Sequence, residues 1–227
     1  MKAIETYYNG YRFRSRLEAR WAVFFDAIGI KYQYEPEGYE FSDGTKYLPD
    51  FFLPEANEYF EVKGEMTEAD MHKIEMLIAE SGKPLAIGYN DFLFEAAQDY
   101  GVYCLDGSCE DSWLCRCHKC KHLYFLGCRG SWACPSCGYY DGDSGFDVIM
   151  YGNHTERWYE PEGEALAAIN KAKSARFEYG ESGKTSAIKA FREKHEHEPP
   201  WKKMFELYDN GDMFAKELIQ RKAAGVL

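Results

Sequence analysis

Apolar side chains recur at every third or fourth position over residues 15–30, a spacing that predicts an amphipathic helix. Ser15 stands at its start with Glu18 three residues later, which is the spacing of a capping box. Gly29 is a natural end for this helix. The apolar side chains that recur at helical spacing are Leu17, Trp21, Phe24, Phe25 and Ile28.

Short runs rich in aromatic and β-branched residues follow, and the turn-forming stretches SDGT and PEAN separate them. A second helical pattern covers 67–82, between the cap Thr67 and the stop Gly82. The apolar run at 84–89 is typical of a buried strand. The order helix, three strands, helix, strand predicts an α/β fold in which helices flank a mixed sheet. The β-like segments are 32–34, 39–41, 47–53 and 59–63.

The rest of the chain is expected to be partly helical. A helix over 91–100 and a strand over 101–105 should follow the buried strand. The stretch GESGKTS is not a phosphate-binding loop, because that motif requires glycine where the chain has Glu178. Further helical patterns lie at 162–177, 185–195 and 201–224.

Charge is distributed unevenly along the chain. The 27 Lys and Arg against 38 Asp and Glu give a net charge of −11, which taken alone argues against a nucleic-acid partner. Residues 35–111 carry 4 basic against 19 acidic side chains. Residues 10–34 carry 5 against 2, and residues 112–140 carry 4 against none. Two basic islands therefore flank an acidic segment, and the net charge does not decide the class of partner.

The chain has no apolar run long enough to span a bilayer, and its first residues lack the apolar stretch of a signal peptide. We therefore expect a cytoplasmic protein without a membrane partner. All eight cysteines lie between Cys104 and Cys137. In a reducing compartment such a cluster indicates metal ligation rather than disulfides.

Three charged residues stand inside the short apolar runs of YLPDFFLPEANEYFEVKG, where burying a charge is costly without a partner or a chemical task. They are Asp50, Glu61 and Lys63. PEANE can turn the chain so that 47–53 and 58–63 become antiparallel neighbours, which brings the three side chains to one face. Mg²⁺ relieves the repulsion between two carboxylates, and a lysine can orient or deprotonate a metal-bound water. The alternative is that Glu61 and Lys63 are exposed while Asp50 caps a turn.

The motifs RSRLEARW, YLPDF and EVKG resemble those of the PD-(D/E)XK nuclease superfamily, whose core is a helix, three strands, a helix and a strand. The resemblance implies a restriction-endonuclease-like fold in which Asp50 and Glu61 bind Mg²⁺ or Mn²⁺ and Lys63 is the catalytic lysine. It also implies phosphodiester hydrolysis that leaves 5′-phosphate and 3′-hydroxyl ends. Glu18 matches the acid that many members, including Holliday junction resolvases and transposon-end endonucleases, add from the first helix. Its alternative role is to cap the helix with Ser15.

Basic side chains on the first helix offer one surface for DNA. Arg14, Arg16 and Arg20 cluster around Glu18 and can contact the DNA backbone, although a solvated helix face explains them equally well.

CHKC at 117–120 and CPSCG at 134–138 are two Cys-x-x-Cys knuckles. Four thiolates at this spacing suit a closed tetrahedral Zn²⁺ site, and the segment looks like a zinc ribbon. The predicted ligands are Cys117, Cys120, Cys134 and Cys137. Cys115 or His118 remains open as a substitute ligand. The default for the other cysteines, Cys104, Cys109, Cys115 and Cys128, is a buried small side chain.

The predicted ribbon also has features of a nucleic-acid surface. Its basic side chains, Arg116, Lys119, Lys121 and Arg129, are candidates for phosphate contacts. Its aromatic side chains, which can stack on unpaired bases or pack the ribbon itself, are Trp113, Tyr124, Phe125, Trp132 and Tyr139. A purely structural role for the ribbon is the alternative.

The sequence thus predicts a metal-dependent DNA endonuclease with a nuclease core at 1–111, a zinc ribbon at 112–145 and a helical C-terminal region at 146–227. Rival activities are a Holliday junction or branched-DNA resolvase, a nicking or homing endonuclease and a restriction-like nuclease. A non-catalytic DNA-binding protein is the alternative outside the enzymes. The compact design suits a phage or mobile-element enzyme, and a homodimer is compatible with it.

Overall fold

The computed structural model describes residues 4–99, 102–103, 112–127, 133–140, 145–152 and 161–177, with the single residues Phe205, Ala215 and Ile219. The chain forms two compact units, one of Arg20–Lys173 and the other of Met1–Ala19 with Ser174–Leu227. The smaller of them contains an antiparallel hairpin of β1 (Thr6–Tyr8) and β2 (Tyr11–Phe13). Among the described residues no helix is long and apolar enough to cross a membrane.

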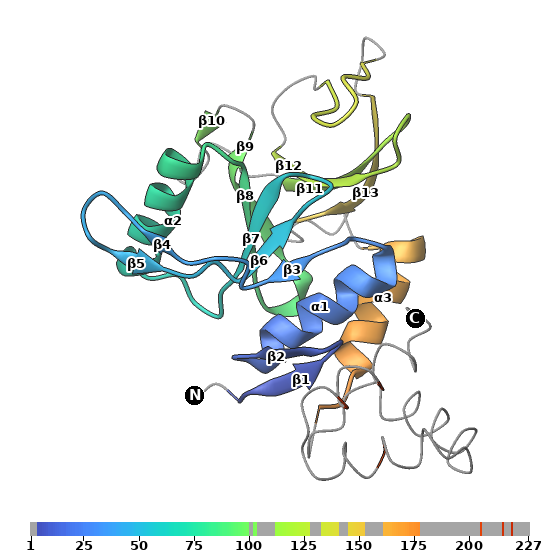
Figure 1. Ribbon diagram of the computed structural model, residues 1–227. Coiled ribbons are helices and arrows are strands. Elements are labelled where there is room, and N and C mark those ends of the chain that lie inside the picture. The colour runs from blue at the N-terminus through green and yellow to red at the C-terminus, as the bar shows by residue number, and fades with distance from the viewer. Residues whose placement is uncertain are drawn as a thin grey trace. The chain divides into compact units, whose positions relative to one another are not determined.

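Within the described residues, the larger unit is built on a six-stranded sheet of order β10-β9-β8-β7-β6-β3 (Figure 1). Every neighbouring pair is antiparallel except β7 and β8, which are parallel. The predicted α/β class and the mixed sheet are therefore confirmed. The strands are β3 (Gln33–Tyr34), β6 (Phe51–Leu53), β7 (Glu58–Val62), β8 (Leu85–Gly88), β9 (Phe94–Asp99) and β10 (Val102–Tyr103).

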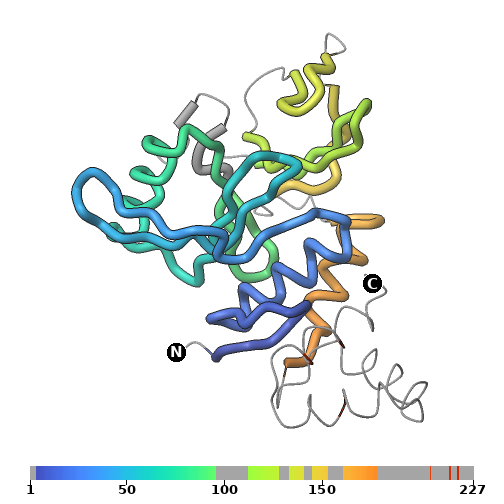
Figure 2. Tube along the Cα trace, in the orientation of Figure 1, coloured from blue at the N-terminus to red at the C-terminus, as the bar shows by residue number. Residues whose placement is uncertain are grey.

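Helix α2 (Glu68–Ser81) makes the crossover between the parallel strands β7 and β8, a path that Figure 2 follows. Thr67 caps its start, because the side chain accepts the N–H of Asp70 at 3.1 Å. Gly82 ends it in the left-handed conformation, with a φ of 65° that favours glycine. Both predicted ends are confirmed. The core between α2 and the sheet includes Tyr59, Ile74, Leu77, Leu85 and Ile87.

The part of helix α1 (Arg16–Ile28) that belongs to the larger unit covers the other face of the sheet. The rings of Trp21 and Phe25 lie 4.8 and 5.0 Å from the ring of Phe60. Phe60 and Tyr59 are neighbours on β7 and point to opposite faces, so α1 and α2 lie on opposite sides of the sheet. On the adjacent strand, a Cβ at Gly88 would lie 2.5 Å from Phe60 and 2.7 Å from Trp21, so only glycine fits there.

A smaller antiparallel sheet of order β12-β11-β13 carries the first cysteine knuckle (Figure 1). Its strands are β11 (Ser112–Cys117), β12 (Leu123–Gly127) and β13 (Phe146–Tyr151). β12 packs on the main sheet through Phe125, whose ring lies 4.8 Å from Phe60 and 4.9 Å from Phe94. The sequence did not indicate β13, which begins just beyond the predicted end of the ribbon.

Two further elements complete the larger unit. A hairpin of β4 (Tyr39–Glu40) and β5 (Lys46–Tyr47) leads into β6. Helix α3 (Gly163–Ser174) lies within the predicted helical pattern 162–177, which is thereby confirmed. The basic side chain of Lys173 at its end pairs with Asp91 at 3.1 Å.

The predicted helix over 91–100 is wrong. The chain instead forms a short 3-10 turn, η1 (Asn90–Phe92), and then strand β9. Asp91 and Phe92 have positive φ values of 58° and 63°, which no α-helix accommodates. Pairing of β9 with β8, and a bond from the N–H of Phe94 to the carbonyl of Gly152, favour the extended conformation over local helix propensity.

Several predictions concern residues outside the described ranges. The helical patterns at 185–195 and 201–224 lie there, apart from Phe205, Ala215 and Ile219, which are helical and buried. Arg129, Trp132, Cys104, Cys109 and Cys128 also lie outside them. The three-part division of the chain into nuclease core, ribbon and helical region stays a prediction.

Candidate active site and candidate metal centre

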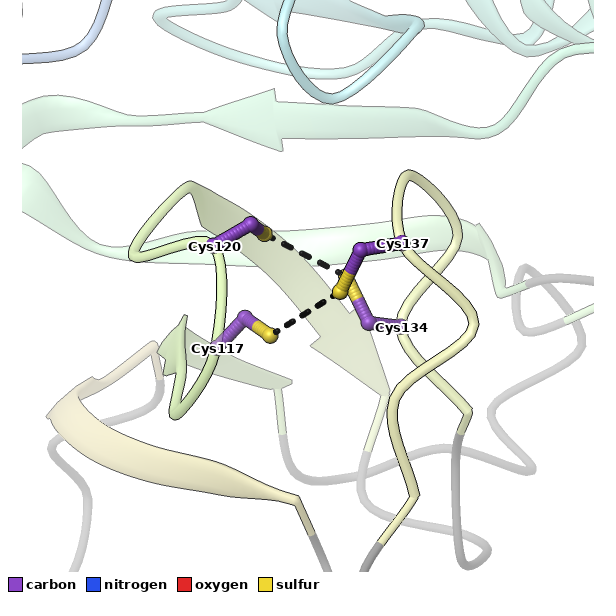
Figure 3. Close-up of side chains that lie close together, drawn as sticks. All are labelled: Cys117, Cys120, Cys134 and Cys137. Carbon is purple, nitrogen blue, oxygen red and sulfur yellow. Dashed lines mark hydrogen bonds between the residues drawn. The ribbon is translucent and has the colours of Figure 1, made fainter.

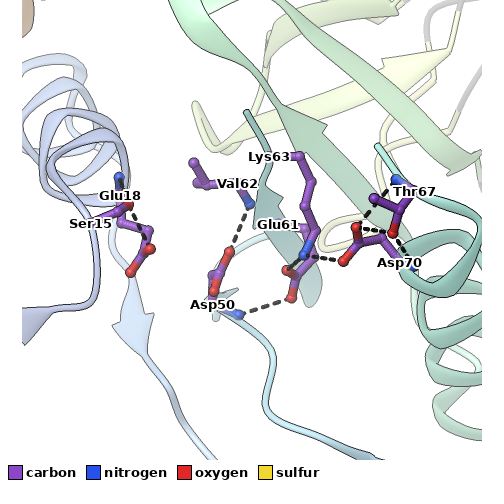
Figure 4. Close-up of polar contacts among 8 residues, drawn as sticks. All are labelled: Ser15, Glu18, Asp50, Glu61, Val62, Lys63, Thr67 and Asp70. Atoms are coloured by element: carbon purple, nitrogen blue, oxygen red, sulfur yellow. Dashed lines mark hydrogen bonds and ion pairs between the residues drawn. The ribbon is translucent and has the colours of Figure 1, made fainter. Parts of the chain in front are cut away.

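The hairpin of β6 and β7 brings Asp50 and Glu61 together (Figure 4). The N–H of Asp50 donates to Glu61 Oε1 at 2.9 Å, and the N–H of Val62 donates to Asp50 Oδ2 at 2.9 Å. Both carboxylates are buried, with relative exposures of 5% for Asp50 and 1% for Glu61. The predicted antiparallel pairing of these strands is confirmed, and the alternative in which Glu61 is exposed is excluded by its burial.

Glu61 Oε2 is the atom of this site that most resembles a cation ligand. It is buried, and no hydrogen bond of good geometry reaches it from the described residues, although the Tyr47 hydroxyl lies close enough to interact with Glu61. Its neighbour is Lys63 Nζ at 3.4 Å. The Lys63 ammonium is the cation beside this buried oxygen, and a carboxylate oxygen can accept more than one partner. Glu61 and Asp50, the residue just before β6, offer carboxylate oxygens, which are the ligands that Mg²⁺ and Mn²⁺ prefer, and the predicted metal site here stays a prediction.

Lys63 bridges two acidic side chains (Figure 4). Its Nζ lies 3.4 Å from Glu61 Oε2 and 3.2 Å from Asp70 Oδ1, and its side chain is mostly buried. Burial by itself lowers the pKa of Lys63, but the carboxylates of Glu61, Asp50 and Asp70 outweigh it and raise the pKa above its ordinary value. The ammonium group therefore offsets the negative charge that the carboxylates concentrate here.

Asp70 belongs to this site although the sequence analysis did not select it. It stands in the first turn of α2, where its Oδ2 accepts the N–H of Thr67 at 3.2 Å and the hydroxyl of Thr67 at 2.6 Å. Its other oxygen, Oδ1, faces Lys63. Burial would raise the pKa of Asp70, but the bonds from Thr67 and the charge of Lys63 lower it. The capping-box spacing of TEAD was the signal in the sequence that marked this aspartate.

Tyr47 is a second residue that sequence reasoning missed. It stands at the end of β5, and its hydroxyl is buried next to the carboxylates. Burial raises the pKa of Tyr47 strongly, and the charges of Glu61, Asp50 and Asp70 raise it further. Tyr47 therefore keeps its proton and presents an O–H donor to this acidic site.

Glu18 makes the contacts expected of a helix cap (Figure 4). Its Oε1 accepts the hydroxyl of Ser15 at 2.6 Å, and its own N–H donates to Ser15 Oγ at 3.1 Å. Its Oε2 accepts the N–H of Arg14 at 3.1 Å, and the side chain is 7% exposed. Glu18 belongs to the unit of residues 1–19 and 174–227, whereas Asp50 and Glu61 belong to the other. Its predicted part in the metal site stays a prediction.

The arginines predicted to surround Glu18 differ in their surroundings. Arg14 is exposed, whereas Arg16 and Arg20 are partly buried. The Nε atoms of Arg16 and Arg20 are buried and make no hydrogen bond to any described residue. Their role in DNA contact stays a prediction.

The four predicted cysteine ligands lie together, with their sulfur atoms all within 4.8 Å of one another (Figure 3). Cys117 Sγ lies 3.8 Å from Cys137 Sγ, and Cys120 Sγ lies 3.6 Å from Cys134 Sγ. A tetrahedral zinc ion with Zn–S distances of about 2.3 Å separates its sulfur ligands by about 3.8 Å. The cluster could therefore hold a metal such as zinc.

The two knuckles that hold these cysteines have the same local geometry. In each, the first cysteine carbonyl accepts the N–H of the residue just after the second cysteine, from Lys121 at 3.1 Å and from Gly138 at 2.8 Å. Both of these residues have a φ of 65°. Burial would raise the pKa of Cys134, but its contact with the Tyr124 hydroxyl and bonds from backbone N–H groups lower it to about 7. A thiolate, the form that binds metal, is thereby favoured at Cys134, whereas burial raises the pKa of Cys120 to about 12 and also raises the pKa of Cys137.

The alternative ligands are not part of the cluster. Cys115 is buried on β11 at 1% exposure, as expected of a small core side chain. His118 Nε2 lies 3.0 Å from Asp147 Oδ1. In the part of the chain that the structure describes, the four predicted cysteines are the one group of three or more such side chains close enough to share an ion.

The basic side chains of the ribbon fall into two classes. Arg116 donates two hydrogen bonds to the carboxylate of Glu164 on α3, at 2.6 and 2.9 Å. Lys119 and Lys121, beside the first knuckle, are exposed. Arg116 is thus engaged within the protein, while the two lysines face solvent.

In comparisons with protein-family models, curated proteins and solved structures, nothing matched this chain. Its function is therefore inferred from the arrangement of its own side chains.

Proposed function

We propose that the chain is a metal-dependent DNA endonuclease that hydrolyses phosphodiester bonds at Asp50, Glu61 and Lys63. One observation carries the proposal: the N–H of Asp50 donates to the buried carboxylate of Glu61, the N–H of Val62 donates to the buried carboxylate of Asp50, and Glu61 Oε2 lies beside Lys63. Such a donor set binds a divalent cation, and the cation with the lysine can then accept a phosphate. The resemblance to PD-(D/E)XK nucleases points to the same three residues.

Each residue has a distinct task in this reaction. Asp50 and Glu61 would hold Mg²⁺ or Mn²⁺, which would lower the pKa of a bound water molecule and neutralise charge on the scissile phosphate. Water adds to phosphorus as the P–O3′ bond breaks, and the products carry a 5′-phosphate and a 3′-hydroxyl. The Lys63 ammonium stabilises the charge that develops on the phosphate oxygens. The surrounding segment 35–111, with 19 acidic side chains, binds a polyanion only when cations offset this charge.

Zinc at the four cysteines completes the proposal. The closed set of four sulfur ligands leaves no open position for a substrate, which is typical of a structural site. We propose that the ribbon helps to hold DNA through Lys119 and Lys121, with Arg129 as a further candidate. Metal analysis should find one zinc per chain, and Cys134→Ser should release it.

The test is digestion of plasmid, linear duplex, single-stranded, branched and RNA substrates with and without Mg²⁺. Glu61→Gln should abolish Mg²⁺-dependent cleavage of every substrate that the natural chain cuts. Glu65→Gln is the matched control, because Glu65 is exposed and lies four residues away. A chain that cuts nothing, or a Glu61→Gln variant that cuts normally, would refute the proposal. The substrate preferred in the panel separates a junction resolvase from a nicking, homing or restriction-like enzyme.

A further inference from the structure

The second cysteine knuckle touches the turn of the hairpin that carries Asp50 and Glu61. Ser136 lies between Cys134 and Cys137, and its hydroxyl donates to the backbone carbonyl of Glu55 at 2.9 Å. Glu55 stands in the turn between β6 and β7. The second cysteine knuckle and the β6–β7 turn, which are far apart in the sequence, therefore meet at the backbone carbonyl of Glu55.

Ser136 is in turn held by a residue that contacts the cysteine sulfurs. The hydroxyl of Tyr124 donates to Ser136 Oγ at 2.8 Å and lies 3.3 Å from Cys134 Sγ. It also lies 3.8 Å from Cys120 Sγ. A continuous chain of polar contacts thus leads from the metal ligands through Tyr124 and Ser136 to Glu55. Groups that contact metal ligands in this way fix the orientation of those ligands.

A second contact to the same hairpin comes from Phe125, the residue after Tyr124 on β12. The N–H of Phe125 donates to Glu58 Oε2 at 3.4 Å, and Glu58 is fully buried at the first position of β7. The ring of Phe125 packs on Phe60 of that strand. Tyr124 and Phe125 are consecutive residues, so one faces the cysteines and the other faces the strand that carries Glu61.

The hairpin is short, although β8 also pairs with β7. β6 has three residues and β7 has five, and the pair Leu53↔Glu58 next to the turn is the last in their register. In a short hairpin the turn sets the register, and register decides which side chains share a face. A movement of the turn therefore displaces Asp50 relative to Glu61. A misplacement of about 1 Å in a catalytic group costs about 100-fold in rate.

We infer that Ser136 and Tyr124 are positioning residues for the active site: they fasten the β6–β7 turn to the metal-bound knuckle, so that the metal at the cysteines orders the hairpin that carries Asp50 and Glu61. The inference rests on the proposed zinc site and nuclease activity. It gives the ribbon a task inside the enzyme that is separate from binding DNA. Loss of the metal lets the two knuckles part, and the Ser136–Glu55 bond then breaks.

The test compares Ser136→Ala with Ser136→Thr in the full chain. Zinc content and the absorption of the Co²⁺-substituted protein report on the cysteine site. Amide hydrogen exchange of peptides covering 50–62 reports on the hairpin, and peptides covering 68–81 in α2 are the internal reference. Turnover and KM on the preferred DNA substrate report on catalysis.

Ser136→Ala should keep one metal per chain while exchange over 50–62 rises several-fold and exchange over 68–81 is unchanged. Turnover should fall by about tenfold or more with KM little changed, because the catalytic groups and not the DNA surface are displaced. Ser136→Thr keeps the hydroxyl and should restore both readouts. Removing zinc from the natural chain should raise exchange over 50–62 in the same way.

Unchanged exchange over 50–62 in Ser136→Ala would overturn the inference, as would loss of the metal from that variant. So would a zinc-free chain in which the knuckles open while 50–62 stays protected. The exchange measurement does not depend on cleavage. If the natural chain cuts no substrate yet its hairpin responds as expected, the proposed nuclease activity fails and the coupling stands.

Discussion

The backbone N–H of Asp50 donates to the Glu61 carboxylate at 2.9 Å, across eleven positions of sequence. The backbone N–H of Val62 donates to the Asp50 carboxylate, also at 2.9 Å. Each acid is therefore oriented by the backbone of the strand that carries the other. A pair of this kind is pre-organised, since its geometry is set by the sheet before any substrate or cation arrives.

The first prediction concerns this pair. Asp50→Asn and Glu61→Gln keep the shape and the capacity to accept the backbone N–H, so the fold should be kept. Loss of either charge removes several kcal/mol of metal-based stabilisation, which corresponds to roughly 1,000-fold in rate. Single-turnover cleavage at several Mg²⁺ concentrations measures it, with circular dichroism as the check on folding. Cleavage within threefold of the natural rate would remove that residue from the site.

The strand that carries Glu61 shows what the sequence could predict and why. Alternation along 58–63 places Glu61 and Lys63 on one face, and PEANE can turn the chain, so local signals predicted the pairing of the strands. The helix over 67–82 follows from its caps in the same way. For this hairpin and this helix, signals within the segment itself were therefore enough.

Residues that reach the site from other elements could not be found this way. Tyr47 and Asp70 come from β5 and α2, and their approach to Glu61 depends on how these elements pack. The pairing of Arg116 with Glu164 spans 48 positions and carries no local signal. In segment 91–100 the alanines and glutamine favoured a helix, but pairing with β8 outweighed a propensity of a few tenths of a kcal/mol per residue.

The second prediction separates the two tasks of Asp70. Asp70→Asn removes the charge that Oδ1 presents to Lys63, while the amide oxygen can still accept from Thr67. We expect cleavage to fall by about 10- to 100-fold, as for other residues that orient catalytic groups. Thr67→Ala is the control, because it removes the cap at a cost of about 1 kcal/mol yet leaves the carboxylate. Thermal unfolding together with turnover of both variants tests the prediction, which fails if Thr67→Ala lowers turnover as much as Asp70→Asn does.

The third prediction concerns Glu18. Glu18→Gln retains an acceptor for Ser15 and should leave the stability of the chain nearly unchanged, because capping boxes accept either residue. If Glu18 also ligates the catalytic metal, cleavage should fall by about tenfold or more and require more Mg²⁺. Ser15→Ala is the matched variant, since it removes the cap and leaves the charge. Full activity of Glu18→Gln with an unchanged Mg²⁺ dependence would confine Glu18 to the cap.

The fourth prediction tests the packing under the site. Gly88→Ala adds a Cβ that would lie 2.5 Å from Phe60 and 2.7 Å from Trp21, two fully buried rings. Neither ring has room to move, so the free energy of unfolding should fall by about 1–3 kcal/mol or more. Gly64→Ala is the control, because a Cβ at Gly64 meets no atom within 4 Å. Denaturant unfolding measures the free energy of unfolding of both variants. Equal values for Gly88→Ala and Gly64→Ala would contradict the packing described for α1.

The last prediction asks which basic side chains of the ribbon meet DNA. Lys119 and Lys121 are exposed, whereas Arg116 is engaged by Glu164 through two hydrogen bonds. Changing both lysines to Gln should weaken DNA binding and flatten the plot of log affinity against log salt by up to about 0.9 for each duplex phosphate that a lysine had neutralised. Arg116→Gln should leave that slope unchanged and lower stability by at most about 1 kcal/mol, since the ion pair is partly exposed.

None of these three residues is among the clustered cysteines, so zinc content should be unaffected in all variants. Binding isotherms at several salt concentrations, with zinc measured on the same preparations, give the comparison. A flattened slope in Arg116→Gln would show that its pairing with Glu164 opens to admit a phosphate. An unchanged slope in the double lysine variant would show that these lysines do not contact DNA phosphates. The contact of the ribbon with the β6–β7 turn would then be its remaining proposed role. The arginines at 14, 16 and 20 would then be the main candidates for the DNA surface, because the acidic segment 35–111 offers few other cations to a phosphate backbone.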